Sequence, residues 1–66
     1  MTYCQAVTDA RKMSKRTDKP TCVFVEMEYG VKEYTACLEE ERDTFYFHIR
    51  DSQVLWSSVD GPYPIL

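Results

Sequence analysis

The chain has 66 residues, which is enough for one small domain and too short for a two-domain enzyme. It is 44% hydrophobic and 29% charged, a globular balance that excludes disordered, collagen-like and coiled-coil proteins. The formal net charge of −3 argues against general nucleic-acid binding, and three cysteines without a CxxC motif favour a reducing compartment. With no membrane-length apolar run and no secretory-signal pattern, we expect a cytoplasmic protein.

The first segment predicts a helix over about residues 2–16. Thr2 can cap this helix together with Gln5, and apolar residues recur behind them at three- and four-residue steps. Pro20 prevents any continuation. The end of the helix is basic, which we interpret as solvated charge that complements the helix dipole. The functional alternative is a contact surface for an acidic partner, and weak nucleic-acid binding is a third interpretation. This basic helix end comprises Arg11, Lys12, Lys15 and Arg16.

After Pro20 the hydrophobic period changes to two, which predicts strands over about residues 21–29 and 32–39. A two-residue turn at Gly30 and Val31 joins them, with glycine in the first central position as a type II′ hairpin requires. The two strands therefore form an antiparallel hairpin.

This turn also predicts the register of the hairpin. It sets Val25 opposite Ala36 on the inner face, toward the helix, and Phe24 opposite Cys37 on the outer face. A slip of one residue would mix the apolar and polar sets, so the pattern favours this assignment of faces.

An acidic run at residues 39–43 interrupts the alternation and is interpreted as a solvated hairpin loop. Alternation then resumes, which predicts a third strand over about residues 44–50. In this strand Phe45, Phe47 and Ile49 face the inner core.

A further strand is predicted over about residues 53–57, although residues 52–60 would also suit a short amphipathic helix. Residues 61–66 form an apolar C-terminal tail in which glycine and prolines end regular structure. The predicted fold class is α+β, with one N-terminal helix on one face of a three- or four-stranded antiparallel β-meander.

The outer face of this sheet is only half polar, which predicts association with a protein. Two other interpretations are that the C-terminal tail covers the apolar patch or that the patch is incidental. We expect a non-catalytic protein-interaction or regulatory module, homodimeric through this face. The expected contact residues are Phe24, Thr35, Cys37, Tyr46 and His48.

The acidic side chains provide an alternative function, that of an inhibitor or nucleic-acid mimic which binds a basic protein. A calcium site is not expected, because the ordered spacing and the turn glycine of a calcium loop are missing. The predicted acidic patch comprises Glu26, Glu28, Glu33, Glu39, Glu40, Glu41 and Asp43.

No motif indicates an enzyme, a metal site or a cofactor. His48 falls beside Cys37 on the outer face, but a nucleophilic dyad needs a pocket and an oxyanion site that an open sheet face does not offer. Adding Cys22 gives no recurring metal-ligand spacing. We therefore expect no catalytic residues, no metal and no cofactor, and neither nucleic-acid nor membrane partners. In size and lack of catalytic motifs, the chain resembles in a general way the small accessory or inhibitor proteins of bacteria and their phages.

Overall fold

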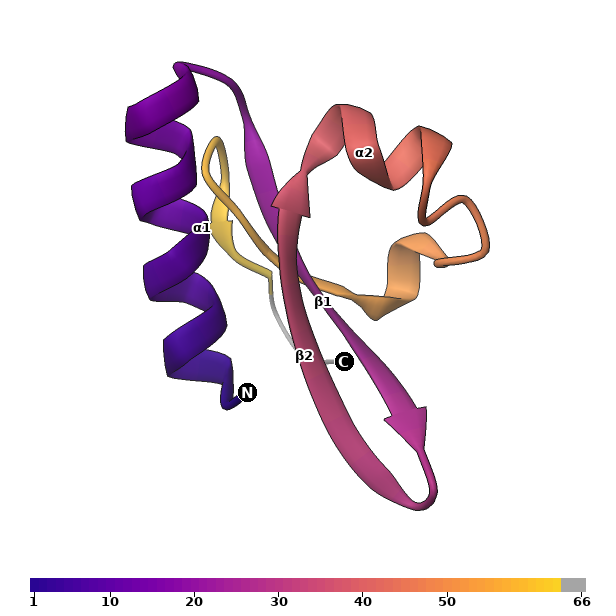
Figure 1. Cartoon of the computed structure of the whole chain (residues 1–66). Helices are drawn as coiled ribbons and strands as arrows, with labels where there is room; N and C mark the ends of the chain where they lie inside the picture. Colours follow the sequence, from indigo (N-terminus) through magenta and orange to yellow (C-terminus); the bar gives the residue numbers. More distant parts are fainter. Residues whose placement is uncertain (64–66) are drawn as a thin grey trace.

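A computed structural model describes residues 1–63 (Figure 1). It confirms the predicted α+β class, since an N-terminal helix packs against a four-stranded antiparallel sheet. The elements follow in the order α1 (Tyr3–Thr17), β1 (Thr21–Glu28), β2 (Val31–Leu38), α2 (Glu39–Thr44), the 3₁₀ helix η1 (Asp51–Gln53), β3 (Val54–Ser57) and β4 (Gly61–Pro62).

The strands do not follow one another across the sheet as they would in a meander. Their order is β2-β1-β3-β4, so β1 is central and β3 pairs with the edge of β1 that the hairpin leaves free. A bulge between Val23 and Phe24 interrupts this second pairing. Residues 39–53 therefore have to cross from β2, at one edge of the sheet, to β3 on the other side of β1.

Helix α1 occupies the range predicted for the N-terminal helix, and its first turn forms the predicted capping box. The Gln5 amide donates to the Thr2 hydroxyl at 3.2 Å, and the Thr2 amide donates to the Gln5 side-chain oxygen at 2.9 Å. The helix ends at Thr17, and the amide of its C-cap residue Asp18 donates the last helical hydrogen bond to the Ser14 carbonyl. Asp18 itself adopts a left-handed backbone, as is common where helices end. Its buried residues are Ala6, Val7 and Ala10.

The β1–β2 hairpin pairs two residues away from the predicted register. The central residues of its turn are Tyr29 and Gly30, with φ angles of 52° and 76°, rather than Gly30 and Val31. Positive φ at both positions is typical of a type I′ turn, whose twist matches that of the strands. Because the shift is an even number of residues, each side chain keeps its predicted face. The shift does change the partners, and it places Cys22 directly opposite Cys37.

The inner core lies between α1 and the sheet, as predicted. Val23 and Trp56 are buried there against the apolar stripe of α1. The Arg11 guanidinium lies 5.7 Å from the centre of the Trp56 ring, a cation–π contact at the edge of this core. The buried Thr21 hydroxyl donates to the Ala10 carbonyl at 2.9 Å, which ties the start of β1 to the helix.

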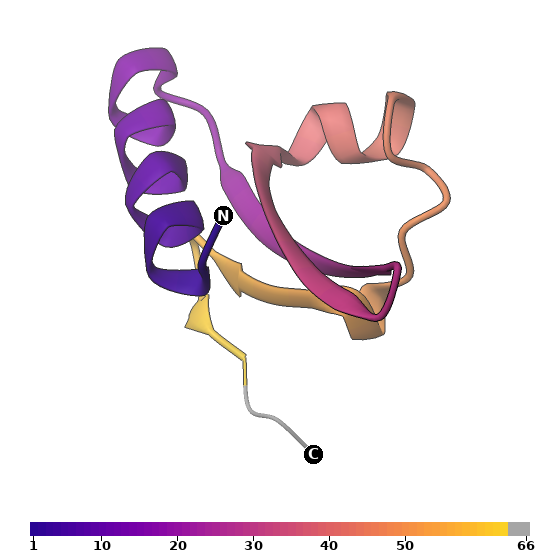
Figure 2. The ribbon, with the colours of Figure 1, turned by 60° about the horizontal axis from the view of Figure 1, so that its bottom comes forward.

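The opposite face of the sheet is covered by residues 39–53, which we call the cover segment. Figure 2 shows this segment arching from the end of β2 to the start of β3, on the side of the hairpin away from α1. It encloses a second cluster, the outer core. The outer core consists of the buried residues Cys22, Phe24, Cys37 and Ile49, with Tyr46 and Val54 packed against them.

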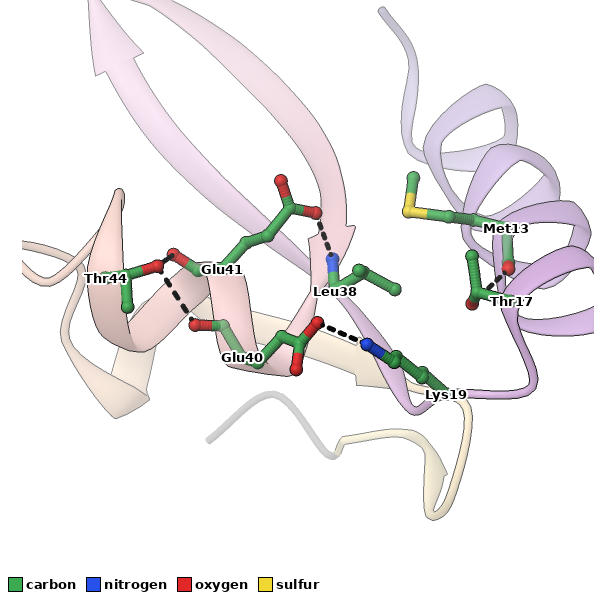
Figure 3. Close-up of polar contacts among 7 residues, drawn as sticks. All are labelled: Met13, Thr17, Lys19, Leu38, Glu40, Glu41 and Thr44. Atoms are coloured by element: carbon green, nitrogen blue, oxygen red, sulfur yellow. Dashed lines mark hydrogen bonds and ion pairs between the residues drawn. The ribbon is translucent and has the colours of Figure 1, made fainter.

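The strand predicted over residues 44–50 is wrong because the acidic run before it forms helix α2 instead of a hairpin loop. Three glutamates in the first turn of α2 complement the partial positive charge of its N-terminus. The Glu41 carboxylate also accepts a hydrogen bond from the Leu38 amide at 3.1 Å, as Figure 3 shows. The chain therefore turns away from the sheet at residue 39.

The irregular residues after α2 bury a different set of side chains from the one predicted. Tyr46 and Ile49, three residues apart, pack into the outer core. Phe45 and Phe47 are exposed and Ile49 lies in the outer core, so the predicted place of all three in the inner core is wrong. The short α2 and the turn after it replace period two by period three, which packs Tyr46 inside and exposes Phe45 and Phe47.

The last part of the described chain completes the sheet. Strand β3 lies in the range where a further strand is predicted, and only the short η1 precedes it. Part of the predicted apolar tail forms β4, and the Tyr63 hydroxyl donates to the Asp60 carboxylate at 2.9 Å. Residues 64–66 of the tail lie outside the described residues. The outer face is covered by residues 39–53, not by residues 61–63.

Candidate interaction surface

The apolar face predicted to bind a partner lies inside the molecule. Phe24 and Cys37 are 0% and 2% exposed, and the Phe24 and Tyr46 rings pack 5.2 Å apart. Tyr46 comes from the cover segment and not from the strand predicted over residues 44–50. The expectation that Phe24 and Cys37 form an open patch is wrong, because the cover segment occupies that face. Thr35 is half-buried and His48 is exposed.

Two exposed phenylalanine side chains lie instead on the cover segment. Phe45 and Phe47 are 73% and 78% exposed, whereas Phe24, the one other phenylalanine in the sequence, is fully buried. They belong to residues 45–50, which we call the aromatic loop. The Phe47 and His48 rings meet edge to face with their centres 6.2 Å apart. The aromatic loop thus presents two large apolar side chains to solvent.

Contacts at both ends hold the aromatic loop in place. The Phe45 amide donates to the Glu41 carbonyl at 2.7 Å, and the Ile49 amide donates to the Tyr46 carbonyl at 2.9 Å. His48 Nε2 lies 3.3 Å from the Glu26 carboxylate of β1. The loop is therefore joined to α2, to the outer core and to the hairpin.

A second set of contacts closes the cover segment below this loop. Arg42 of α2 forms an ion pair with Asp51 of η1, and this hydrogen bond raises the pKa of Arg42 above its usual value. The Gln53 side chain donates to the Val25 carbonyl at 3.0 Å. Side chains of α2 and η1 thus join the two ends of the arch to each other and to β1.

The predicted acidic patch divides into two groups on either side of the aromatic loop. Helix α2 begins where β2 ends, at the end of the hairpin opposite its turn, and the remaining glutamates lie along the hairpin toward that turn (Figure 1). The α2 group is Glu39, Glu40, Glu41 and Asp43, and the hairpin group is Glu26, Glu28 and Glu33.

Several of these carboxylates have partners within the chain. Glu40 forms an ion pair with Lys19 at 2.9 Å, which Figure 3 shows beside the Glu41 contact. Glu26 and Glu33 lie opposite each other in the hairpin, which is a repulsive arrangement. Each of the two carboxylates also lies near a nitrogen atom of another residue. Glu26 contacts His48, and Glu33 lies 3.5 Å from the amino group of Met1. Within residues 1–63, no ion pair forms at Glu28, Glu39 or Asp43.

The basic helix end lies on the other side of the sheet from the cover segment (Figure 2). All four of its cationic side chains are exposed, and Lys15 and Arg16 lie in the last turn of α1 as predicted. Arg11 is engaged with the Trp56 ring. The structure therefore separates the basic and acidic surfaces that the charge distribution predicts.

Two thiols meet beneath the cover segment. The sulfur atoms of Cys22 and Cys37 are 3.7 Å apart and both residues are buried, while Cys4 is exposed on α1. Hydrogen bonding by the Cys37 thiol lowers the pKa of Cys22, whereas burial and the negative charge of Glu39 raise it. The same hydrogen bond and burial raise the pKa of Cys37.

A concave surface lies beside the hairpin. A hollow of about 430 Å³ opens between β1, β2 and η1, and Gln53 in its wall is already bonded to the Val25 carbonyl. Among residues 1–63, no group of three or more His, Cys, Asp or Glu side chains is arranged to hold a metal ion. In the same residues, no helix has the length and apolar character needed to cross a membrane. The hollow is lined by Val25, Glu26, Met27, Lys32, Arg50, Ser52 and Gln53.

Sequence reasoning missed the aromatic loop and the thiol pair. A signal for α2 was present, since three successive glutamates followed by an arginine suit the first and last turns of a short helix. Once residues 39–44 form a helix, the alternating apolar and polar residues that follow cannot pair with β2 as the next strand of a hairpin. The pairing of Cys22 with Cys37 required the turn to be centred on Tyr29 and Gly30.

No family model matches the chain, and no curated protein or solved structure matches it either.

Proposed function

We propose that the chain is a small, non-catalytic protein-interaction module that binds a basic protein surface through the aromatic loop and the carboxylates on either side of it. The exposure of Phe45 and Phe47 carries this proposal, because the same chain buries Phe24 completely. We place the module in a reducing, cytoplasmic setting, in keeping with its free thiols.

The two phenylalanines are suited to act as anchors. Burying a phenylalanine side chain contributes about 1.5–3 kcal/mol, and aromatic residues are enriched among those that dominate interface energies. The backbone beneath Phe45 and Phe47 is hydrogen-bonded to α2 and flanked by two residues packed in the outer core. Binding therefore requires little further ordering of the chain, which favours affinity.

Charge defines the kind of partner. The α2 group and the hairpin group place carboxylates on both sides of the aromatic loop, and Glu28, Glu39 and Asp43 form no ion pair within residues 1–63. An acidic border attracts lysine and arginine side chains and accelerates association at low salt. The homodimer expected through the outer sheet face is not part of this proposal, because two of its expected contact residues, Phe24 and Cys37, are buried in the single chain.

The proposal is tested by selection of a random peptide library displayed on phage against the immobilised protein in reductant. We expect the enriched peptides to combine lysine or arginine with an apolar residue. Calorimetric titration of a selected peptide should show at least ~10-fold weaker binding to a Phe45→Ser, Phe47→Ser double variant, since two apolar anchors are lost.

Val59→Ser is the matched control, because Val59 is as exposed as Phe45 and lies in the turn between β3 and β4. It should bind the peptide as the wild type does, and circular dichroism should show that all variants are folded. Enriched peptides without net positive charge, or equal binding by the double variant, would refute the proposal. A wild-type dimer in light scattering that the double variant dissociates would assign the loop to a second copy and also overturn it.

A further inference from the structure

We propose that Cys22 and Cys37 are a buried dithiol that a small peroxide oxidises to an intrachain disulfide, and that opening of the cover segment controls access of the peroxide. This inference rests on the outer core and the cover segment, and it does not depend on the proposed binding function.

The pairing of the strands brings the two cysteines to bonding geometry. Cys22 and Cys37 lie directly opposite each other in the antiparallel hairpin. Opposed residues in such a pair have Cα atoms about 4.5–5.5 Å apart, within the roughly 4.4–6.8 Å that a disulfide spans. Their sulfur atoms are already 3.7 Å apart. A bond of about 2.05 Å therefore requires only a small displacement of two side chains and no change of register.

The cover segment determines how an oxidant reaches these thiols. Cys22 and Cys37 are 1% and 2% exposed, and Ile49 of the aromatic loop packs in the same cluster. The cover is attached to the outer core by only two side chains of the aromatic loop, Tyr46 and Ile49. Its other attachments include surface contacts such as the exposed Lys19–Glu40 ion pair, which contributes little to stability. Segments with few buried contacts open locally without global unfolding. Local opening of residues 39–53 exposes the dithiol while α1 and the inner core stay in place.

Cys22 is the expected attacking sulfur. Its hydrogen bond with Cys37 favours the thiolate, against the opposing effects of burial and of the Glu39 carboxylate. The Cys22 sulfur attacks one oxygen of hydrogen peroxide and the O–O bond breaks, which gives a sulfenic acid. The displaced hydroxide takes up the proton lost by the thiol and leaves as water. The Cys37 sulfur then attacks the Cys22 sulfur, the S–O bond breaks, and a second water leaves. The two thiols lose two electrons and two protons, and the peroxide is reduced to two waters.

The third cysteine is excluded from this pair by its position. Cys4 lies on α1, on the other side of the sheet from the outer core, and its thiol is exposed. It can form disulfides between molecules, which would obscure the intrachain reaction. The test therefore uses a Cys4→Ser background.

Folded Cys4→Ser protein is treated with hydrogen peroxide and followed by intact-mass spectrometry and thiol titration. We expect the loss of two hydrogens and of both titratable thiols, reversed by a reductant. The oxidised form should melt at least ~5 °C higher, because the disulfide closes the hairpin as a loop in the unfolded chain. Adding Ile49→Ala, which loosens the cover, should accelerate oxidation several-fold, whereas adding Val59→Ala should leave the rate unchanged.

Cys37→Ser in the same background should stop at a sulfenic acid on Cys22, detected by a dimedone reagent. If that variant does not fold, the Cys4→Ser protein alone decides the question. Retention of both thiols in folded protein, under conditions that oxidise the urea-unfolded chain, would refute the inference. Equal rates in the Ile49→Ala and Val59→Ala variants would overturn the role of the cover segment.

Discussion

The two faces of the sheet are covered in different ways. On the inner face, α1 is a single regular helix that buries residues at helical spacing. On the outer face, the cover segment combines the six residues of α2, an irregular loop and the three residues of η1, and it reaches the outer core with Tyr46 and Ile49. A regular helix buries apolar side chains at a constant spacing along its whole length, whereas the irregular cover segment is held to the sheet by a few buried side chains. The outer face is therefore the one that can open and the one that was hard to predict.

The two faces also differ in the part of the chain that is left for function. Helix α1 uses its apolar side chains in the inner core and presents charge to solvent. The cover segment presents Phe45 and Phe47 to solvent and encloses a pair of thiols. Both proposals made above lie on the irregular side of the molecule. This agrees with the general tendency of binding residues to lie on loops held by a regular scaffold.

Trp56→Ala should give the largest loss of stability, because Trp56 fills the inner core between Val23 and α1. Removing a buried tryptophan costs about 3–5 kcal/mol, which is most of the stability expected of a small domain. Urea unfolding followed by circular dichroism should show a largely unfolded variant in water. Val59→Ala, at an exposed site, should stay within about 0.5 kcal/mol of the wild type. A loss below about 1 kcal/mol in Trp56→Ala would show that the inner core is not the principal core.

Ile49→Ala should destabilise the outer face selectively. The buried Ile49 side chain anchors the aromatic loop, and its removal costs about 2–4 kcal/mol. Hydrogen exchange should show faster exchange of amides in residues 39–53, including the Ile49 amide that is bonded to the Tyr46 carbonyl. Amides of α1 should keep a higher opening free energy than those of the cover segment. Equal loss of protection in α1 and the cover segment would mean that the two faces open together.

The inner face could be predicted from the sequence because its signals are periodic and mutually consistent. The capping pair Thr2 and Gln5 marked the start of α1, and alternation marked which side of β1 holds Val23. An error of two residues in the hairpin register left these assignments intact, since faces repeat every second residue. The same error concealed the Cys22–Cys37 pair, because partners do not repeat in that way.

The outer face could not be predicted by the same rules because its local signals conflict. Leu38 precedes α2 at the position where serine, threonine or aspartate usually marks a helix start, so the helix lacks its ordinary cap residue. The alternation after α2 is typical of a strand, yet tertiary packing selects Tyr46 and Ile49 and exposes Phe45 and Phe47. Phe45 and Phe47 belong to this misassigned segment. They were therefore predicted in the core, although they form the candidate interaction surface.

Tyr29→Asn should slightly stabilise the protein, because it relieves the unfavourable left-handed backbone conformation in the turn that sets the hairpin register. Tyr29 has a φ of 52°, a left-handed conformation that asparagine adopts more easily than tyrosine, and Asn-Gly is the preferred type I′ sequence. Its side chain is 99% exposed, so the substitution removes no packing. We expect a gain of about 0.5–1 kcal/mol, measured as a higher urea midpoint at unchanged m-value. Tyr29→Ala is the control, because alanine removes the ring without easing positive φ, and it should give no gain. Equal midpoints for the two variants would show that backbone conformation does not limit this turn, and the register that pairs Cys22 with Cys37 would then depend on contacts along the strands.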